Sequence, residues 1–166
     1  MAVTIQIIGA KNTGKTLVVT RLIDRLTKDG YRVAAIKHDA HASSMDVPGT
    51  DSYQMSAAGA HQVILVHQQG SRPALSKMVA RLAPDNDVII IEGHKAAPYP
   101  KVCLLDEEHP GTLTATPALI RTGRVVKNAR VDKSALSNLV AAIYTDLKHQ
   151  MEDGEETLIG IILAGG

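Results

Sequence analysis

The chain has 166 residues, 45% of them hydrophobic and 2% aromatic, so it is long enough to bury a single aliphatic core. Its formal net charge of +1 gives no electrostatic reason to expect a nucleic acid or an anionic membrane as partner. One cysteine, Cys103, excludes an internal disulfide, and neither a membrane-spanning stretch nor a signal peptide is evident, so we expect a cytoplasmic protein.

The first predicted elements are a strand, a glycine-rich loop and a helix. Residues 3–8 form an apolar run typical of a buried strand, and residues 17–26 have the periodicity of an amphipathic helix. Between them, residues 9–16 read GAKNTGKT and match the phosphate-binding loop pattern. Its glycines allow consecutive backbone N–H groups to converge on a phosphate at the positive end of the helix. The order of these elements predicts binding of a nucleoside triphosphate.

The residues of this loop have distinct expected roles. Lys15 can reach the β- and γ-phosphates, and the hydroxyl of Thr16 can bind Mg²⁺. Further contacts to the nucleotide are expected from the rest of the loop, namely Gly9, Asn12, Thr13 and Gly14.

Strands and helices alternate along most of the chain. This pattern predicts an α/β fold of the P-loop NTPase type, with three layers and a mostly parallel central sheet covered by helices on both faces. After the first strand, further strands are predicted at residues 32–37, 62–67, 88–91, 101–105 and, as an edge strand, 118–121. Helices are predicted at residues 51–58, 75–82 (after Pro73) and 133–150.

A polar segment, residues 37–52, starts where the second predicted strand ends. The carboxyl ends of parallel strands meet at one edge of a sheet, so we expect this segment beside the phosphate loop, where a nucleotide-sensing switch would lie. Asp46 is a candidate ligand of a metal or a water. Lys37 and His38 are candidate contacts to phosphate or substrate, and Asp51 either contacts the nucleotide or only caps the next helix.

The fully apolar strand at residues 88–91 is followed by Glu92. An acidic residue at the carboxyl end of a central strand commonly holds the metal opposite a phosphate loop. We therefore expect Glu92 to hold Mg²⁺ through a water or to polarise the attacking water; the alternative is an ordinary surface carboxylate. Lys15, Glu92 and Asp46 form the predicted catalytic set, and Thr16, Glu92 and Asp46 the predicted metal set.

Several motifs occur in order between residues 3 and 105. They read GAKNTGKT at 9–16, IKH at 36–38 with His41, D-x-P-G-x-D-S-Y at 46–53, AGA at 58–60, and I-E-G-x-K at 91–95 followed by Pro100-Lys101. Together they resemble the molybdopterin-guanine dinucleotide biosynthesis protein B (MobB) family of P-loop GTP-binding adaptors. The phosphate loop alone is shared by many families, whereas the combination is much more specific.

The resemblance implies a homodimeric protein that binds GTP with Mg²⁺ and has weak GTPase activity. Such a protein would assist its partner enzyme, a molybdopterin guanylyltransferase of the MobA family, in attaching GMP to molybdopterin, and could itself contact molybdopterin. The same resemblance gives the nucleotide and magnesium roles to Lys15, Thr16 and Glu92. It places Asp46 and Asp51 in the switch loop of that family.

The composition changes near the end of the chain. We expect the nucleotide-binding domain to span residues 1–150, followed by an acidic linker at 151–157 and an apolar segment at 158–166. The apolar segment predicts a strand that pairs with the sheet edge or across a dimer. It also resembles the opening strand and glycine loop of the MobA family, so the start of a truncated fusion is the alternative.

Two other functions are compatible with the phosphate loop. A small-molecule kinase would use the same loop, although no arginine-rich lid segment is obvious. A metallochaperone GTPase would need metal ligands, for which His38 and His41 are candidates.

Overall fold

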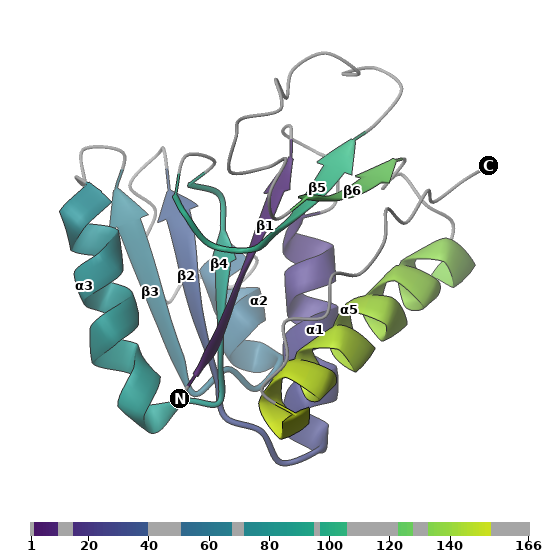
Figure 1. Cartoon of the computed structure of the whole chain (residues 1–166), viewed down its shortest axis with the longest axis horizontal. Helices are drawn as coiled ribbons and strands as arrows, with labels where there is room; N and C mark the ends of the chain where they lie inside the picture. The colour runs from purple at the N-terminus through teal and green to yellow at the C-terminus, as the bar shows by residue number, and fades with distance from the viewer. Residues whose placement is uncertain are drawn as a thin grey trace.

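A parallel sheet forms the middle layer of the molecule (Figure 1). The computed structural model describes residues 2–9, 15–39, 51–67, 72–94, 97–105, 123–127 and 133–153, and within them the sheet has six strands in the order β3-β2-β4-β1-β5-β6. Each neighbouring pair of strands runs parallel. The strands are β1 (Val3–Gly9), β2 (Val33–Asp39), β3 (Gln62–His67), β4 (Val88–Glu92), β5 (Lys101–Leu105) and β6 (Gly123–Lys127).

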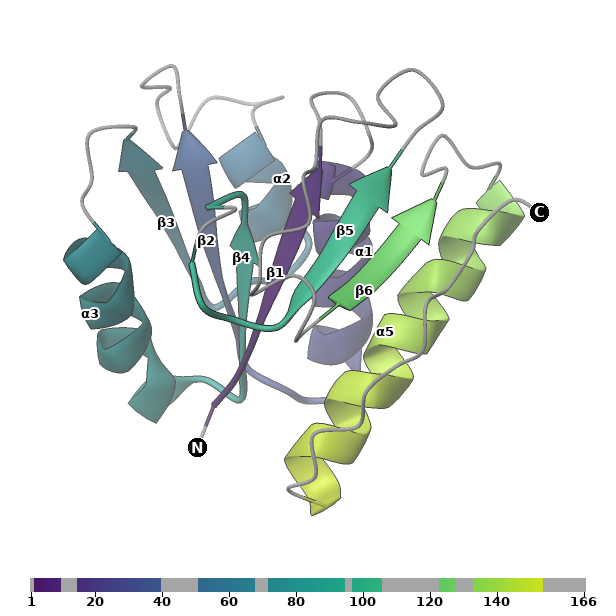
Figure 2. The same ribbon diagram turned by 45° about the horizontal axis from the view of Figure 1, so that its top comes forward.

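Helices cover both faces of this sheet (Figure 1, Figure 2). They are α1 (Lys15–Lys28), α2 (Asp51–Ala57), α3 (Arg72–Leu82) with the short 3-10 helix η1 (Ala83–Asp85), and α5 (Lys133–Asp153). One core contains side chains of α1 and α5 together with Met55 of α2, and the other contains Leu75 and Leu82 around α3. Successive side chains of a strand point to opposite faces, so Ile90 of β4 lies in the first core and Ile91 in the second. The predicted three-layer α/β architecture is confirmed.

Helix α1 illustrates why these segments fold as they do. Its buried side chains recur at helical spacing and form one apolar stripe: Val18, Val19, Leu22, Ile23 and Leu26. Arg25 and Lys28 lie in its last turn, where positive charge is favourable beside the unpaired carbonyls. The helix ends before Gly30, whose φ of +90° is a conformation that glycine adopts without strain.

We expect Leu22→Ala to lower the free energy of unfolding by about 2–5 kcal/mol, because a fully buried side chain is replaced by a cavity. Leu17 lies on the same helix but is 47% exposed, so Leu17→Ala is the matched control and should change stability by less than about 1 kcal/mol. Urea denaturation of both variants measures the difference. Equal losses would mean that α1 does not pack on the sheet through this stripe.

Most element boundaries lie within two residues of the predicted ones, and the differences at α3, β6 and α5 have physical consequences. Helix α3 begins at Arg72, so Pro73 lies inside its first turn, where the missing N–H costs nothing because that group has no partner within the helix. The edge strand observed is Gly123–Lys127; the predicted one, 118–121, lies outside the described residues. Helix α5 continues to Asp153, so the first residues of the predicted acidic linker are helical, and the rest of that linker and the segment 158–166 lie outside the described residues.

In the part of the chain that the structure describes, no helix combines the length and the apolar character needed to cross a membrane.

Candidate functional site

The candidate site lies where β1, β2 and β4 end and α1 begins. Strand β4 lies between β1 and β2, and Glu92 is in register with Ile7 of β1 on one side and Lys37 of β2 on the other. Strand β1 ends at Gly9, and α1 starts at Lys15 after the phosphate-loop residues 10–14, which lie outside the described part. The carboxyl edge of an open parallel sheet is where ligands bind in such folds.

Glu92 is the centre of a buried polar cluster. One of its oxygens, Oε1, accepts a hydrogen bond from Thr16 Oγ1 at 3.1 Å and another from Lys37 Nζ at 3.2 Å. The side chains of Lys37 and Glu92 are only 16% and 6% exposed, so this ion pair is shielded from water. The other oxygen, Oε2, is buried and has no hydrogen-bond partner among the residues that the structure describes. Thr16, Lys37 and Glu92 therefore meet at the carboxyl edge of the sheet.

Lys15 joins the two ends of the phosphate loop. Its Nζ atom donates a hydrogen bond of 2.9 Å to the backbone carbonyl of Gly9. This contact holds an ammonium group next to the loop and one residue away from the hydroxyl of Thr16. The arrangement places a positive charge and a hard oxygen ligand side by side at the N-terminus of α1, the end that favours anions.

A pair of stacked imidazoles lies next to this cluster. The rings of His38 and His94 are 4.6 Å apart between centroids and inclined by 21°. Burial, with the nearby His38 as a second cause, lowers the pKa of His94. The turn that carries His94 has φ of +91° at Gly93 and +57° at His94, and a Cβ atom at Gly93 would come within 3.0 Å of the Cβ atom of His38. Glycine is therefore required at position 93 by both its conformation and this close approach.

Gln6 and Lys101 are functional candidates to which the sequence assigned no individual role, although Lys101 belongs to the Pro100-Lys101 pair that carries the family resemblance. Both side chains lie within strands and are fully buried, and Lys101 Nζ donates to Gln6 Oε1 at 2.7 Å. Burial lowers the pKa of Lys101 to about 8. The sequence signals were a polar residue within the first apolar run for Gln6, and for Lys101 its place at the start of an apolar run, directly after the I-E-G-x-K motif.

The free energy of unfolding should rise as the pH increases from about 8 towards 10. An unfolded lysine keeps its usual pKa of 10.5, whereas Lys101 has a pKa of about 8 when folded. Between these values the unfolded chain binds more protons, so stability increases with pH. The range stops near pH 10 because Tyr144, with a pKa raised to about 12 by its hydrogen bond to Asp29, acts in the opposite direction above it. Denaturation of the unmodified chain and of Lys101→Met across this range measures the effect; equal slopes would contradict it.

Some predicted site residues are not placed. Asn12, Thr13, Gly14, His41 and Asp46 lie outside the described residues. Asp51 is the first residue of α2, but its side chain is not among those described. Among the residues that the structure does describe, no three His, Cys, Asp or Glu side chains form a cluster able to hold a metal ion.

Comparison with known proteins decides the family. The model of the family "Molybdopterin guanine dinucleotide synthesis protein B" matches residues 4–122, well over half of the chain. The chain belongs to the MobB family. The phosphate loop, Lys37, Glu92 and Lys101 all lie inside the matched region.

Individual MobB relatives agree with this assignment. A probable molybdopterin-guanine dinucleotide biosynthesis adapter protein from Bacillus subtilis is 32% identical over 114 residues, covering 63% of this chain and 65% of the relative. The adapter protein from Haemophilus influenzae is 32% identical over 111 residues, covering 61% of this chain and 62% of the relative. The matched stretch thus spans less than two thirds of these curated relatives.

The solved structures show the same fold. A MobB protein homolog from Bacillus stearothermophilus superposes with a TM-score of 0.56 at 20% identity, covering 87% of this chain and 97% of that one. At this identity the similarity establishes the fold, which is the predicted P-loop NTPase fold.

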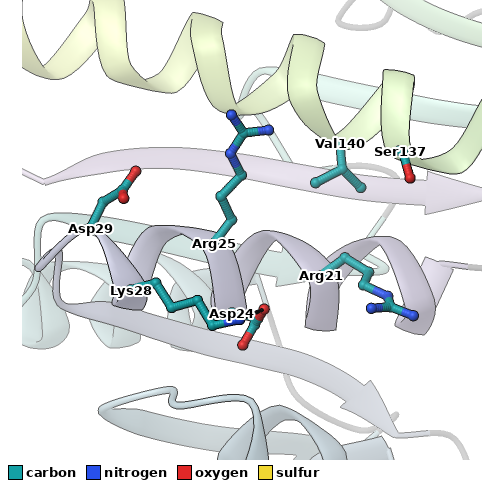
Figure 3. A pocket seen from close by; sticks show the side chains of 7 residues that line it. All are labelled: Arg21, Asp24, Arg25, Lys28, Asp29, Ser137 and Val140. Carbon is teal, nitrogen blue, oxygen red and sulfur yellow. Dashed lines mark hydrogen bonds and ion pairs between the residues drawn. The ribbon is translucent and has the colours of Figure 1, made fainter.

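One cavity of this MobB-family chain, of about 430 Å³, lies between α1 and α5 (Figure 3). Figure 3 shows Arg25 extending from α1 towards α5, and Lys28 directed towards Asp24. The Lys28–Asp24 ion pair measures 2.9 Å, and the guanidinium of Arg25 lies 4.3 Å from the ring centre of Tyr144. Tyr144 in turn donates a hydrogen bond to Asp29. These charges are engaged within the protein, so we interpret the cavity as part of the contact between the two helices.

Proposed function

We propose that this chain is a GTP-binding adaptor with weak GTPase activity that assists guanylyl transfer to molybdopterin in the biosynthesis of the molybdenum cofactor. The observation that carries this proposal is the buried cluster of Thr16, Lys37 and Glu92 beside Lys15, within a chain of the MobB family. Its relatives are named as adapter proteins of that biosynthesis.

The oxygen atoms of the cluster fit Mg²⁺. A hydroxyl and a carboxylate are the hard ligands that this ion prefers, and Glu92 Oε2 is buried without a hydrogen-bond donor. Thr16 and Glu92 would hold the ion, Glu92 either directly or through a water, and Asp46 is the proposed third contributor. When bound, Mg²⁺ neutralises charge on the β- and γ-phosphates.

The two lysines take complementary roles. Lys15 can exchange its bond to the Gly9 carbonyl for the terminal phosphates, because an ammonium binds a phosphate oxygen more strongly than a neutral carbonyl. Lys37 neutralises Glu92 and lies two residues before the end of β2, at the start of the proposed switch segment. His38, Asp51 and loop residues Gly9, Asn12, Thr13 and Gly14 are the further proposed nucleotide contacts.

The proposed partner is a guanylyltransferase of the MobA family, with molybdopterin as a further contact. We also propose a homodimer that acts in the cytoplasm. In the proposed domain division, residues 158–166 pair with a sheet edge or across that dimer, and residues 154–157 connect them to α5.

Two measurements on the full chain test the function. In calorimetric competition with Mg²⁺, GTP should bind at least about tenfold more tightly than ATP, and co-purification with the guanylyltransferase should increase when GTP is present. A preference for ATP would favour a small-molecule kinase instead. Stoichiometric nickel or zinc binding that is lost in both His38→Ala and His41→Ala would favour a metallochaperone.

A further inference from the structure

Two buried polar side chains connect β1 and β5 to the segment that follows β4. Gln6 and Lys101 are both fully buried, although they lie in strands whose neighbouring residues are apolar. A buried amide or ammonium is costly unless it is fully hydrogen-bonded. Their bonds therefore indicate what these two residues hold in place.

The amide of Gln6 holds the turn directly after Glu92. Its Nε2 atom donates to the carbonyl of Gly93 at 3.0 Å and to the carbonyl of His94 at 2.8 Å. Both residues have positive φ, and for His94 this conformation is strained. A non-glycine residue persists in this conformation when surrounding contacts stabilise it, and the two bonds from Gln6 are such contacts.

Lys101 completes the network on the other side of the same amide. Its Nζ atom donates to Gln6 Oε1 at 2.7 Å, to the carbonyl of Tyr99 at 2.7 Å and to the carbonyl of Ala97. The three donors of the ammonium thus meet three acceptors. The Oε1 atom of Gln6 also accepts a bond of 3.3 Å from the backbone N–H of Tyr99.

The backbone of this segment is also fastened to β1. The N–H of Gly93 donates to the carbonyl of Ile7 at 3.0 Å, and the N–H of Gln6 donates to the carbonyl of Pro100 at 2.8 Å. A further bond of 2.9 Å from the N–H of Ala97 to the carbonyl of His94 closes the turn. These three backbone bonds attach the segment after β4 to β1 and hold Ala97 against His94.

We propose that Gln6 and Lys101 are positioning residues that hold the Gly93–His94 turn so that Glu92 keeps its place beside Thr16 and Lys37. Neither residue touches the nucleotide in this assignment; both act through the turn. Glu92 is the last residue of β4 and precedes the strained turn directly, so a relaxed turn changes where its carboxylate points. The consequence for magnesium depends on the proposed function, whereas the rigidity of the turn does not.

Gln6→Glu is the sharpest test. The new carboxylate has the same size and still accepts a bond from Lys101, but it cannot donate to the carbonyls of Gly93 and His94. In the nucleotide-free full chain, amide hydrogen exchange at Gly93 and Ala97 should become at least about tenfold faster, while the amides of residues 89–91 in β4 stay protected. Lys101→Met, which removes the donors to Ala97 and Tyr99, should give the same pattern.

Asn86→Asp is the matched control. Asn86 is also a buried amide that donates two hydrogen bonds, to Gln62 Oε1 at 2.9 Å and to the carbonyl of Leu82 at 2.8 Å, but it precedes β4 instead of following it. Its substitution should leave exchange at Gly93 and Ala97 unchanged.

Nucleotide binding provides the second readout. Mg²⁺ should tighten GTP binding at least about fivefold less in Gln6→Glu than in the unmodified chain, while affinity without Mg²⁺ stays within about twofold. Unchanged exchange at Gly93 and Ala97 in both Gln6→Glu and Lys101→Met would overturn the positioning role, as would an equal change in Asn86→Asp. If the unmodified chain binds no GTP, the proposed function fails, and the exchange experiment still decides the role of the turn.

Discussion

Lys15→Ala is expected to weaken GTP binding by at least about 100-fold. The side chain lies at the start of α1 and is held against the carbonyl of Gly9 at 2.9 Å, beside the loop that we propose to bind the phosphates. Its removal deletes the ammonium that the terminal phosphates would bind. The fold should persist, because losing one hydrogen bond to a carbonyl costs about 1 kcal/mol.

Lys28→Ala is the matched control for this substitution. Lys28 ends the same helix, is exposed, and forms an ion pair of 2.9 Å with Asp24 one helical turn away. Titration calorimetry of both variants with GTP and Mg²⁺ gives the comparison, and circular dichroism checks that the helices remain. GTP affinity that is retained in Lys15→Ala would refute the assignment of residues 9–16 as a phosphate-binding loop.

Glu92→Gln should remove most of the magnesium dependence that we expect of GTP hydrolysis. The substitution keeps an acceptor for Thr16 and Lys37 but replaces the charged, partnerless Oε2 atom, which is the atom best placed for a cation. We expect magnesium-dependent GTP hydrolysis to fall about 100-fold, with a smaller effect on GTP binding in the absence of Mg²⁺. Steady-state phosphate release at several Mg²⁺ concentrations measures this change.

Asp87→Asn is the corresponding control, because Asp87 is an exposed carboxylate at the opposite end of the same strand. Its Oδ2 atom accepts a hydrogen bond of 2.8 Å from the backbone N–H of Arg32, far from the phosphate loop along the strand. Hydrolysis should be unaffected by this change. A similar loss in both variants would show that the effect comes from altered β4 packing instead of a lost metal ligand.

The fold could be predicted largely because its strands are continuous apolar runs separated by helical periodicity. Strand β3 agrees with its predicted bounds, and α1 extends the predicted helix by a few residues at each end. The edge strand β6 was harder to predict because Gly123–Lys127 combines glycine and two basic residues with a very short apolar run. The start of α3 was misplaced because a proline in a first helical turn reads like a boundary.

The site residues likewise differ in whether a local sequence pattern marks them. Lys15, Thr16 and Glu92 could be predicted because a loop motif and a strand end are local patterns in the sequence. The Gln6–Lys101 pair and the stacking of His94 on His38 could not, because they depend on strand order. Strand β1 lies between β4 and β5, which brings side chains nearly 100 positions apart into one network.

Thr16 and Lys37 both donate to one oxygen of Glu92, and this affects the order in which Mg²⁺ and nucleotide bind. Without nucleotide, the ammonium of Lys37 already neutralises the carboxylate of Glu92. A free divalent ion must compete with this ion pair, so its binding to Glu92 is weakened. A nucleotide whose phosphate oxygens bind Lys37 or Thr16 would release Glu92 Oε1 and remove that competition. We therefore expect Mg²⁺ and the nucleotide to bind as one complex, and Mg²⁺ alone to bind only weakly.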